Sequence, residues 1–253
     1  MKKKCAVFTI VKNESYFLPI WLKHYKKYFD STDIYVLDHQ STDGSTQDLD
    51  VNVVPVINEL AFDHQWLVNT VQSQQEKLLQ EYESVLFAES DELVYTLEKP
   101  LNEVIDDFIN DSSVTHQTCS GYEVIEDIGN EKILEPGDEI FKNRNFWFKH
   151  SLYDKTLLSK IPLRWIWGFH SPINVSPNNK YNLFLCHLHR CDFEFMLKRH
   201  EERATKWKLK DDGAGVGFQH RIGDREGVLK YFNDIPNKPI TIPEKHKEVL
   251  YGV

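Results

Sequence analysis

The stretch Ser84-Val85-Leu86-Phe87-Ala88-Glu89-Ser90-Asp91-Glu92-Leu93-Val94 decides how this chain is expected to fold. Residues 86–88 have the short, continuous apolar run that is typical of a strand covered on both faces. Three carboxylates follow within four positions, where such a strand would leave its sheet. Ligands of open α/β sheets bind in the crevice beyond the carboxyl ends of the strands. The stretch therefore predicts a buried strand that delivers acidic side chains to a binding crevice.

Glu89 and Asp91 are the pair of acids that points to a cation. They are two positions apart, so their side chains point the same way if the backbone stays extended. Like charges in that arrangement repel each other unless a cation lies between them. Carboxylate oxygens on neighbouring residues suit Mg²⁺ or Mn²⁺, and a phosphate can supply further ligands to the same ion. These residues leave a second interpretation equally open, a solvated acidic turn between a strand and a loop.

The composition indicates a globular protein without a basic face. The chain has 253 residues, of which 41% are hydrophobic and 13% aromatic, and this is enough for a large core within one domain. A formal net charge of -9 argues against a nucleic-acid partner. No apolar run approaches the roughly 18 residues of a membrane span, and no signal peptide is recognisable, so we expect a cytoplasmic protein without a transmembrane segment. The four cysteines lack framework spacing and are expected to be reduced thiols.

Strand and helix patterns alternate over the first 110 residues. Strands are predicted over 5–11, 34–37, 51–57 and 86–88, and Pro55 places the third at a sheet edge. Helical spacing follows over 16–29, over 63–82 with Asp63 as N-cap, and again from Pro100. This alternation predicts an α/β fold with a doubly wound, mainly parallel sheet and helices on both faces.

The remainder of the chain is less regular. A strand or strand pair is predicted over 114–125 and an irregular segment over 126–149. Two apolar segments, 165–170 and 183–189, each end in histidine. Asp192 is expected to cap a helix that runs to about residue 207, and the tail from Pro236 is expected to be extended.

Five short motifs in a fixed order carry a resemblance to a known family. The chain resembles the family 2 type of glycosyltransferase with a GT-A fold, closest to the compact bacterial and viral branch that starts with a "KNE…W…H" opening. The resemblance implies a GT-A-like domain over 1–207, with a donor half over about 1–110 and an acceptor and metal half over about 111–207. A C-terminal loop, a short helix and an extended tail would follow over 208–253. The motifs are Val11-Lys12-Asn13-Glu14 with Trp21 and His24, Val36-Leu37-Asp38-His39-Gln40-Ser41-Thr42-Asp43-Gly44, Phe87-Ala88-Glu89-Ser90-Asp91-Glu92, Gly168-Phe169-His170 and His187-Leu188-His189.

The resemblance also implies a nucleotide-sugar donor, UDP-linked, with Mn²⁺ or Mg²⁺ on its diphosphate. Asp38 matches the acid that holds the base or ribose, and the other wall of that pocket would come from Val11, Asn13 and Glu14. The stretch Glu89-Ser90-Asp91 stands where the family has Asp-x-Asp.

By the same resemblance, Asp91 would ligate the metal, and Glu89 would reach the ribose or a metal-bound water. Glutamate in the first place of the motif is a departure that puts direct ligation by Glu89 in doubt. His187 matches a further metal ligand, with a hydrogen-bonded structural histidine as the alternative. Arg144 and Lys155 are candidates for contact with the diphosphate.

Inverting transfer, implied by the resemblance alone, needs a base for the acceptor hydroxyl. Glu123 ranks first because it follows Gly121 at a predicted strand end. Other acidic candidates, Asp138 among them, lie in 126–149, and His170 competes because it follows Gly168 and Phe169. The acceptor implied is a glycan or lipid-linked glycan, as in polysaccharide biosynthesis, and a peripheral contact with a membrane stays open.

Other functions remain compatible with the sequence. A nucleotidyltransferase acting on a sugar phosphate would use a similar sheet, but such enzymes normally carry a glycine-rich basic loop after the first strand, where this chain has Lys12-Asn13-Glu14. A catalytically silent carbohydrate-binding protein of the same fold is a third possibility. The run 186–191 offers four potential zinc ligands, but strand alternation puts Cys186 on the opposite face from the two histidines. The glycine-rich run 213–217 is expected to form a loop over the donor.

Overall fold

The computed structural model describes residues 2–60, 63–206 and 221–252, and the glycine-rich run 213–217 lies outside them. Its first sheet has the strand order β3-β2-β1-β4-β9-β6. The first four strands in this order are parallel, whereas β9 runs antiparallel to β4 and β6 antiparallel to β9. Pro55 lies in β3 at the sheet edge, as predicted. The strands are β1 (Lys3–Val11), β2 (Ile34–Asp38), β3 (Asn52–Pro55), β4 (Tyr82–Phe87), β6 (His116–Thr118) and β9 (Thr156–Ser159).

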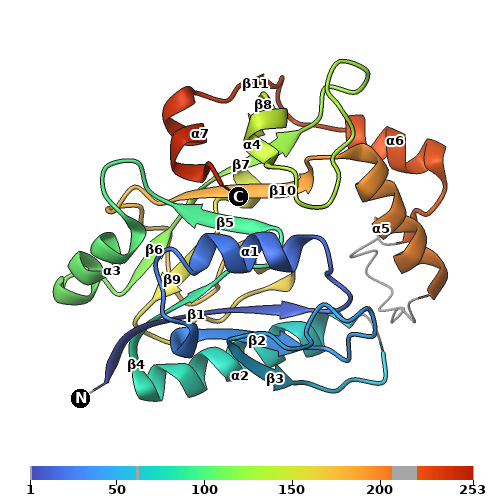
Figure 1. Cartoon of the computed structure of the whole chain (residues 1–253). Coiled ribbons are helices and arrows are strands. Elements are labelled where there is room, and N and C mark those ends of the chain that lie inside the picture. The colour runs from blue at the N-terminus through green and yellow to red at the C-terminus, as the bar shows by residue number, and fades with distance from the viewer. Residues whose placement is uncertain (1, 61–62, 207–220, 253) are drawn as a thin grey trace.

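A second sheet of five strands lies above the first in Figure 1, in the order β11-β8-β7-β10-β5. Of its strand pairs, β7 with β10 is parallel and the others are antiparallel. The α/β class predicted from the sequence is confirmed, but the expected single, mainly parallel sheet is replaced by two mixed ones. The strands are β5 (Glu92–Tyr95), β7 (Ser120–Ile125), β8 (Phe146–Lys149), β10 (Phe184–Arg190) and β11 (Ile240–Thr241).

Two predictions for the second half are wrong in detail. The segment 126–149 contains α4 (Ile140–Asn143) and β8, because Trp147 and Phe148 are buried when this strand pairs with β7. The C-terminal tail is not simply extended. It contributes β11 and α7 (Glu244–Leu250). A hydrogen bond of 2.6 Å joins His246 Nδ1 of α7 to the Tyr95 hydroxyl.

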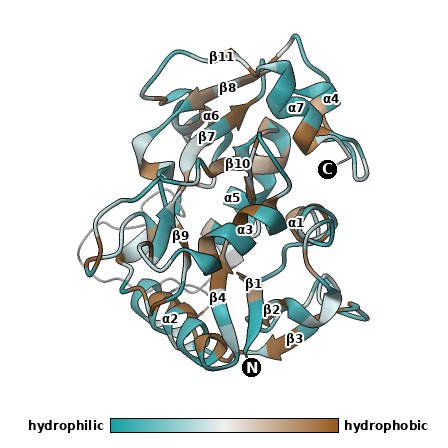
Figure 2. Cartoon of the chain, turned by 90° about the vertical axis from the view of Figure 1, so that its left-hand side faces the viewer, coloured by the Kyte–Doolittle hydropathy of each residue, from teal (hydrophilic) through white to brown (hydrophobic). Residues whose placement is uncertain are grey.

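The helices α1 and α2 cover opposite faces of the parallel strands in Figure 1. Helix α2 begins as predicted, since the Asp63 carboxylate accepts hydrogen bonds from two backbone N–H groups of its first turn. Helix α1 lies between the two sheets, and Figure 2 shows the hydrophobic residues gathered on the strands and inner helix faces. No helix of the described residues combines the length and apolar character needed to cross a bilayer. Besides α4 and α7, the helices are α1 (Phe17–Tyr25), α2 (His64–Glu81), α3 (Leu101–Asn110), α5 (Phe193–Lys206) and α6 (Arg225–Asn233). Three short 3-10 turns are η1 (Ser31–Asp33), η2 (Ser151–Tyr153) and η3 (Trp167–Phe169).

Helix α1 joins the two sheets, because its buried side chains contact both of them. Trp21 and Tyr25 pack in the core of the first sheet, whereas Phe17 packs in that of the second. His24 is fully buried, and its Nε2 is hydrogen-bonded to the backbone carbonyl of Val94 in β5 at 2.8 Å. Trp21 and His24 of the opening motif therefore have a structural role.

We expect His24 to make stability depend on pH. Burial lowers the pKa of His24 to about 4, below its ordinary value of 6.5, so the unfolded chain binds this proton more readily than the folded protein. The contribution of neutral His24 to the free energy of unfolding is therefore fully present above pH 6.5 and is lost as the pH falls toward 4. Between pH 7 and pH 5 the free energy of unfolding should fall by about 2 kcal/mol from this cause. Urea unfolding of wild type and His24→Gln at both pH values measures this. Equal losses in the two proteins would contradict the assignment.

Candidate functional site

A pocket of about 470 Å³ opens where the parallel strands of the first sheet end. The ends of β1 and β2 meet there with β10 of the second sheet and with the N-terminus of α2. Helix α5 closes one side, and η2 and η3 close the opposite side. The predicted crevice beyond the strand ends is therefore present, and it is lined from both sheets.

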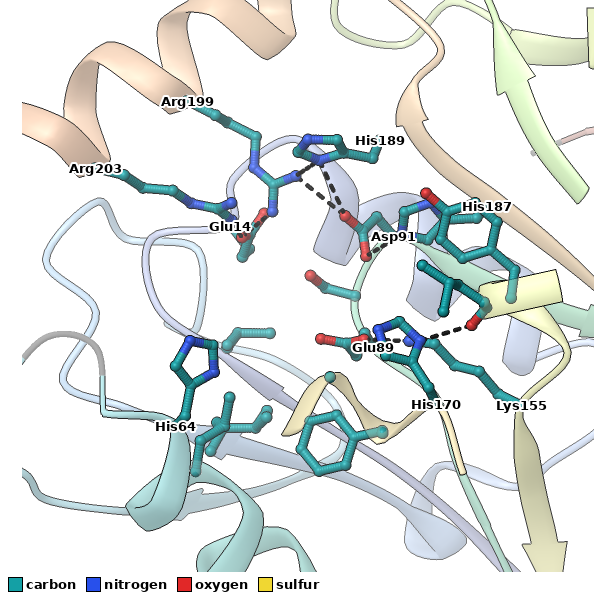
Figure 3. A pocket seen from close by; sticks show the side chains of 18 of the residues that line it. Glu14, His64, Glu89, Asp91, Lys155, His170, His187, His189, Arg199 and Arg203 are labelled. Atoms are coloured by element: carbon teal, nitrogen blue, oxygen red, sulfur yellow. Dashed lines mark hydrogen bonds and ion pairs between the residues drawn. The ribbon is translucent and has the colours of Figure 1, made fainter. Parts of the chain in front are cut away.

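Asp91 occupies the turn in which the chain passes from β4 to β5. Its backbone carbonyl accepts a hydrogen bond of 2.9 Å from Leu188 N, which fixes the turn to β10. Its carboxylate Oδ2 lies 3.1 Å from Arg199 Nη1, and its Oδ1 lies 3.8 Å from His187 Nε2 (Figure 3). Burial opposes ionisation, but His187 and Arg199 outweigh it and keep the pKa of Asp91 well below its usual range. Asp91 is therefore a carboxylate already paired with cations.

Glu89 lines the same pocket but faces a different cation. The backbone does not stay extended after β4, because Glu92 N donates a turn hydrogen bond of 2.9 Å to Glu89 O. The Glu89 carboxylate then accepts a hydrogen bond of 2.6 Å from Lys155 Nζ. Lys155 is buried and also lies 2.6 Å from Glu92 Oε1. The two acids predicted to converge on one cation are thus divided between Lys155 and Arg199.

Glu123 lies behind His187 and outside the pocket lining. The two residues are register partners in the parallel strands β7 and β10, and Glu123 Oε2 is 2.7 Å from His187 Nδ1. Glu123 also accepts from Arg190 N at 2.9 Å. Although burial lowers the pKa of His187, Glu123 and Asp91 raise it to about 9. The ring of Tyr153 stacks on His187 at 4.4 Å, so His187 is held on three sides.

His170 presents a neutral imidazole to the pocket from the opposite side. Its Nδ1 is 2.6 Å from the carbonyl of Leu152, an acceptor, so Nδ1 carries the proton and Nε2 the lone pair. Burial and the nearby Lys155 lower the pKa of His170. Gly168 makes room for the ring, since a Cβ at this residue would lie 2.5 Å from His170 Nε2.

His39 and Trp66 form an aromatic wall at the other end of the pocket. Their rings are 4.5 Å apart, and His39 is buried with a pKa lowered to about 4 by burial. Among the described residues, none hydrogen-bonds to His39 Nε2. This nitrogen is also closed off from solvent, and the backbone of Asn58 and Leu60 lies close enough to the ring to oppose the fall in its pKa.

Asp38 and Asn13 organise the turn beside this wall and do not line the pocket. Asp38 Oδ1 accepts from Ser41 N at 2.9 Å, and the Asn13 side-chain oxygen accepts from Thr42 N at 2.7 Å. The sequence prediction chose Asp38, whereas the next residue, His39, is the one that reaches the pocket.

Two further predicted residues lie away from the pocket. Arg144 is fully buried beneath the second sheet, where its Nη2 lies 3.0 Å from Asp192 Oδ2. Asp138 lies in a turn in which its carboxylate pairs with Lys132 at 2.8 Å. The predicted residues that the structure does bring together in the pocket are Val11, Glu14, Glu89, Ser90, Asp91, Lys155, His170 and His187.

Sequence reasoning missed the two arginines of α5 that enter the pocket. Arg199 contacts Asp91 as described, and its Nη2 is 2.5 Å from Glu14 Oε1, while Arg203 Nη2 is 3.5 Å from the same oxygen. Arg199 and Arg203 are four positions apart, so they lie on one face of a helix. Two arginines four positions apart, on the helix that follows the predicted strand 183–189, were the feature of the sequence that could have indicated an anion site.

The residues that the structure describes form no complete metal site by themselves. Within 2–60, 63–206 and 221–252, no three His, Cys, Asp or Glu side chains gather closely enough to hold an ion. Cys186 and Cys191 are buried in the core of the second sheet, which does not favour the zinc interpretation of 186–191. Asp91 and His187 remain as two side chains facing one pocket, and Glu123 orients His187 as outer partners orient metal-binding histidines. To act as a ligand, His187 would release the proton on Nε2 as the cation binds. These residues fit a cation whose other ligands come from a phosphate.

The chain was compared with family models, with curated proteins and with solved structures. No protein-family model matches this sequence, and no curated protein matches it either. Among solved structures, the chain is similar to a cytidylyltransferase from Leptospira borgpetersenii serovar Hardjo-bovis (strain JB197), with a TM-score of 0.32 and 12% identity over 46% of this chain and 54% of that one. It is also similar to the apo structure of the WbbM bifunctional glycosyltransferase, with a TM-score of 0.31 and 13% identity over 51% of this chain and 24% of that one. Both proteins are transferases by name. This chain spans about half of the first and about a quarter of the second. Membership of family 2 stays a prediction.

We expect Gly168→Ala to displace His170. Gly168 has φ +73°, which costs an alanine roughly 1–2 kcal/mol, and the clash with His170 Nε2 adds about 1–3 kcal/mol. Gly129→Ala is the matched control, since Gly129 has φ +88° but nothing within 4 Å of its Cβ position. Urea unfolding should show the larger loss of stability for Gly168→Ala. Equal losses would mean that His170 is not held against Gly168.

Proposed function

We propose that the protein is a glycosyltransferase that moves a sugar from a nucleotide-sugar, UDP-linked, to a glycan or lipid-linked glycan. One observation carries the proposal: a single pocket at the strand ends combines an aromatic wall, a cationic and acidic centre, and a neutral imidazole. These three parts match the three demands of glycosyl transfer, which are a site for the nucleotide, neutralisation of the leaving diphosphate and a base.

The nucleotide base belongs at the wall made by His39 and Trp66. The rings of His39 and Trp66 lie 4.5 Å apart, and the apolar side chains of Ile10 and Leu67 line the same pocket. A flat pyrimidine ring can pack its face on such a surface.

The diphosphate belongs between Asp91 and the arginines of α5. Asp91 and His187 would hold the divalent cation, Mn²⁺ or Mg²⁺, with Glu123 fixing the His187 ring. When bound, the cation neutralises charge on the leaving diphosphate. Glu89 is tied to Lys155 and is therefore assigned to the acceptor side rather than to the metal.

His170 is assigned as the base for the acceptor hydroxyl. Its Nε2 lone pair faces the pocket and can take the proton as the acceptor oxygen bonds to the anomeric carbon and the bond from that carbon to the diphosphate breaks. This attack from the opposite face inverts the anomeric centre. Glu123 is not assigned as the base, because its carboxylate is enclosed with His187 and Arg190.

Binding of the nucleotide tests the function itself. UDP-sugars, UDP and nucleoside triphosphates are titrated with and without Mn²⁺ by calorimetry. Mn²⁺-dependent binding of UDP-sugar and UDP supports the proposal. Selective binding of triphosphates would favour a nucleotidyltransferase instead, and binding of no nucleotide would favour a carbohydrate-binding protein.

Asp91→Asn should weaken Mn²⁺-dependent UDP binding by about 100-fold, because a charged metal ligand is lost. Asp106→Asn is the control, since Asp106 pairs with Lys4 on the exposed surface, outside the pocket lining. Calorimetric titration of UDP in Mn²⁺ measures both. Wild-type affinity in Asp91→Asn would remove this residue from the donor site.

His170→Gln should lower kcat by roughly 10²–10⁴-fold and leave UDP affinity in Mn²⁺ within about twofold, because a base acts on the acceptor and not on the donor. His116→Gln serves as the control, because His116 lies outside the pocket lining and bonds to the Ser176 carbonyl. Product formation and UDP binding are measured on the same preparations. Unchanged kcat would exclude His170 as the base.

A further inference from the structure

We propose that Arg199 and Arg203 form a phosphate-binding site in which Arg199 exchanges partners: it neutralises Asp91 in the empty pocket and moves to a donor phosphate when a divalent cation binds Asp91. The site takes a diphosphate, the leaving group of the transfer, so this inference rests on the proposed function. It gives Arg199 two successive roles within one pocket.

The first role is visible in the contacts of Arg199 (Figure 3). Its guanidinium reaches Asp91 at 3.1 Å, Glu14 at 2.5 Å and His189 Nδ1 at 3.3 Å. Asp91 and Glu14 are both more than nine-tenths buried, and two buried carboxylates would repel each other without a cation between them. Arg199 thus occupies the position at which a cation is needed.

The second role follows from what a bound cation would do to these contacts. Asp91 Oδ1 faces His187 and Oδ2 faces Arg199, so both sides of the carboxylate are already engaged with nitrogen groups. A divalent ion on Asp91 would bring a second positive charge beside Arg199 and weaken its hold there. The phosphates that would accompany the ion would supply new acceptors for its N–H groups.

Arg203 adds a second positive charge beside Arg199, and this favours a negatively charged ligand. It lies one helical turn from Arg199 and shares Glu14 with it. Burial, together with the charge of Arg199, lowers the pKa of Arg203 to about 10. An anion bound between two neighbouring, buried guanidinium groups reduces the repulsion between their positive charges. A guanidinium group can also donate two parallel hydrogen bonds to a pair of phosphate oxygens.

The packing of Arg199 allows it to turn without leaving the pocket. Its guanidinium carbon lies 4.8 Å from the centre of the Phe17 ring, on the face of α1 that packs in the second core. Stacking on an aromatic face fixes the plane of the group while its N–H edge stays available to acceptors in that plane. A rotation in the plane of the stacked group would exchange the acceptor and keep the contact with Phe17.

The test compares binding of Mn²⁺ alone with binding of UDP in the presence of Mn²⁺. Arg199→Gln should bind Mn²⁺ alone about tenfold more tightly, measured by electron paramagnetic resonance, because the competing cation at Asp91 is gone. The same variant should bind UDP in saturating Mn²⁺ about 10- to 100-fold more weakly, because a charged hydrogen bond to phosphate is lost. Arg225→Gln is the matched control, since Arg225 pairs with Glu194 on the surface. Opposite shifts of the two affinities support the exchange, and a change in neither or a loss of both overturns it.

Two further variants guard against a folding defect and separate this inference from the proposed function. Glu14→Gln combined with Arg199→Gln removes one charge of each sign, and it should fold as wild type by circular dichroism and show the same opposite shifts. Arg199→Lys keeps the charge but not the guanidinium fork, so it should restore only part of the UDP affinity that Arg199→Gln loses. If wild type binds UDP with Mn²⁺ but the variants show no opposite shifts, only the exchange is wrong. If wild type binds no nucleoside diphosphate, the proposed function fails with it.

Discussion

The centre of this protein depends on the neutralisation of buried carboxylates by cations that come from other parts of the chain. Glu14 and Asp91 share Arg199 of α5, and Glu92 is paired with Lys155, the residue before β9. Glu123 of β7 is enclosed by His187 and Arg190 of β10. Removing one member of such a pair leaves an unpaired charge in a poorly solvated place, so each pair constrains both of its segments. Together the pairs bind the first sheet, the second sheet and α5 around one pocket.

The passage from β4 to β5 explains why the acids are arranged as they are. The chain leaves the first sheet after Phe87 and enters the second at Glu92, so Glu89 and Asp91 lie in the connection between sheets. A turn in this connection sends Glu89 toward Lys155 and Asp91 toward Arg199. One short segment therefore supplies the proposed acceptor side and the proposed donor side with a carboxylate each.

The sequence was a good guide wherever the signal was local. Apolar runs and helical spacing located β1, β2, β4, α2 and α3, and Asp63 capped α2 as predicted, because each of these depends on neighbouring residues. The division into two sheets was not predicted, since β5 looks like a continuation of β4 and its partner β10 lies about 90 residues away. Asp38 was preferred to His39 for a similar reason: which of two adjacent side chains enters a pocket depends on the turn that follows, here held by Asp38 itself. Arg199 was missed because an arginine on a polar helix is ordinarily solvated, and its partners Glu14 and Asp91 are remote in sequence.

The connection between the sheets also limits how this molecule can move. Because 88–91 are the link between β4 and β5 and are further pinned to β10 by the hydrogen bond from Leu188 N to Asp91 O, the sheets cannot slide past each other without distorting the segment that bears both acids. Adaptation of the pocket to the proposed donor is thus left to long side chains such as Arg199 rather than to sliding of the two sheets. A scaffold of this kind keeps a constant spacing between Asp91 and Glu89, and under the proposed function it would select substrates by their length across that span.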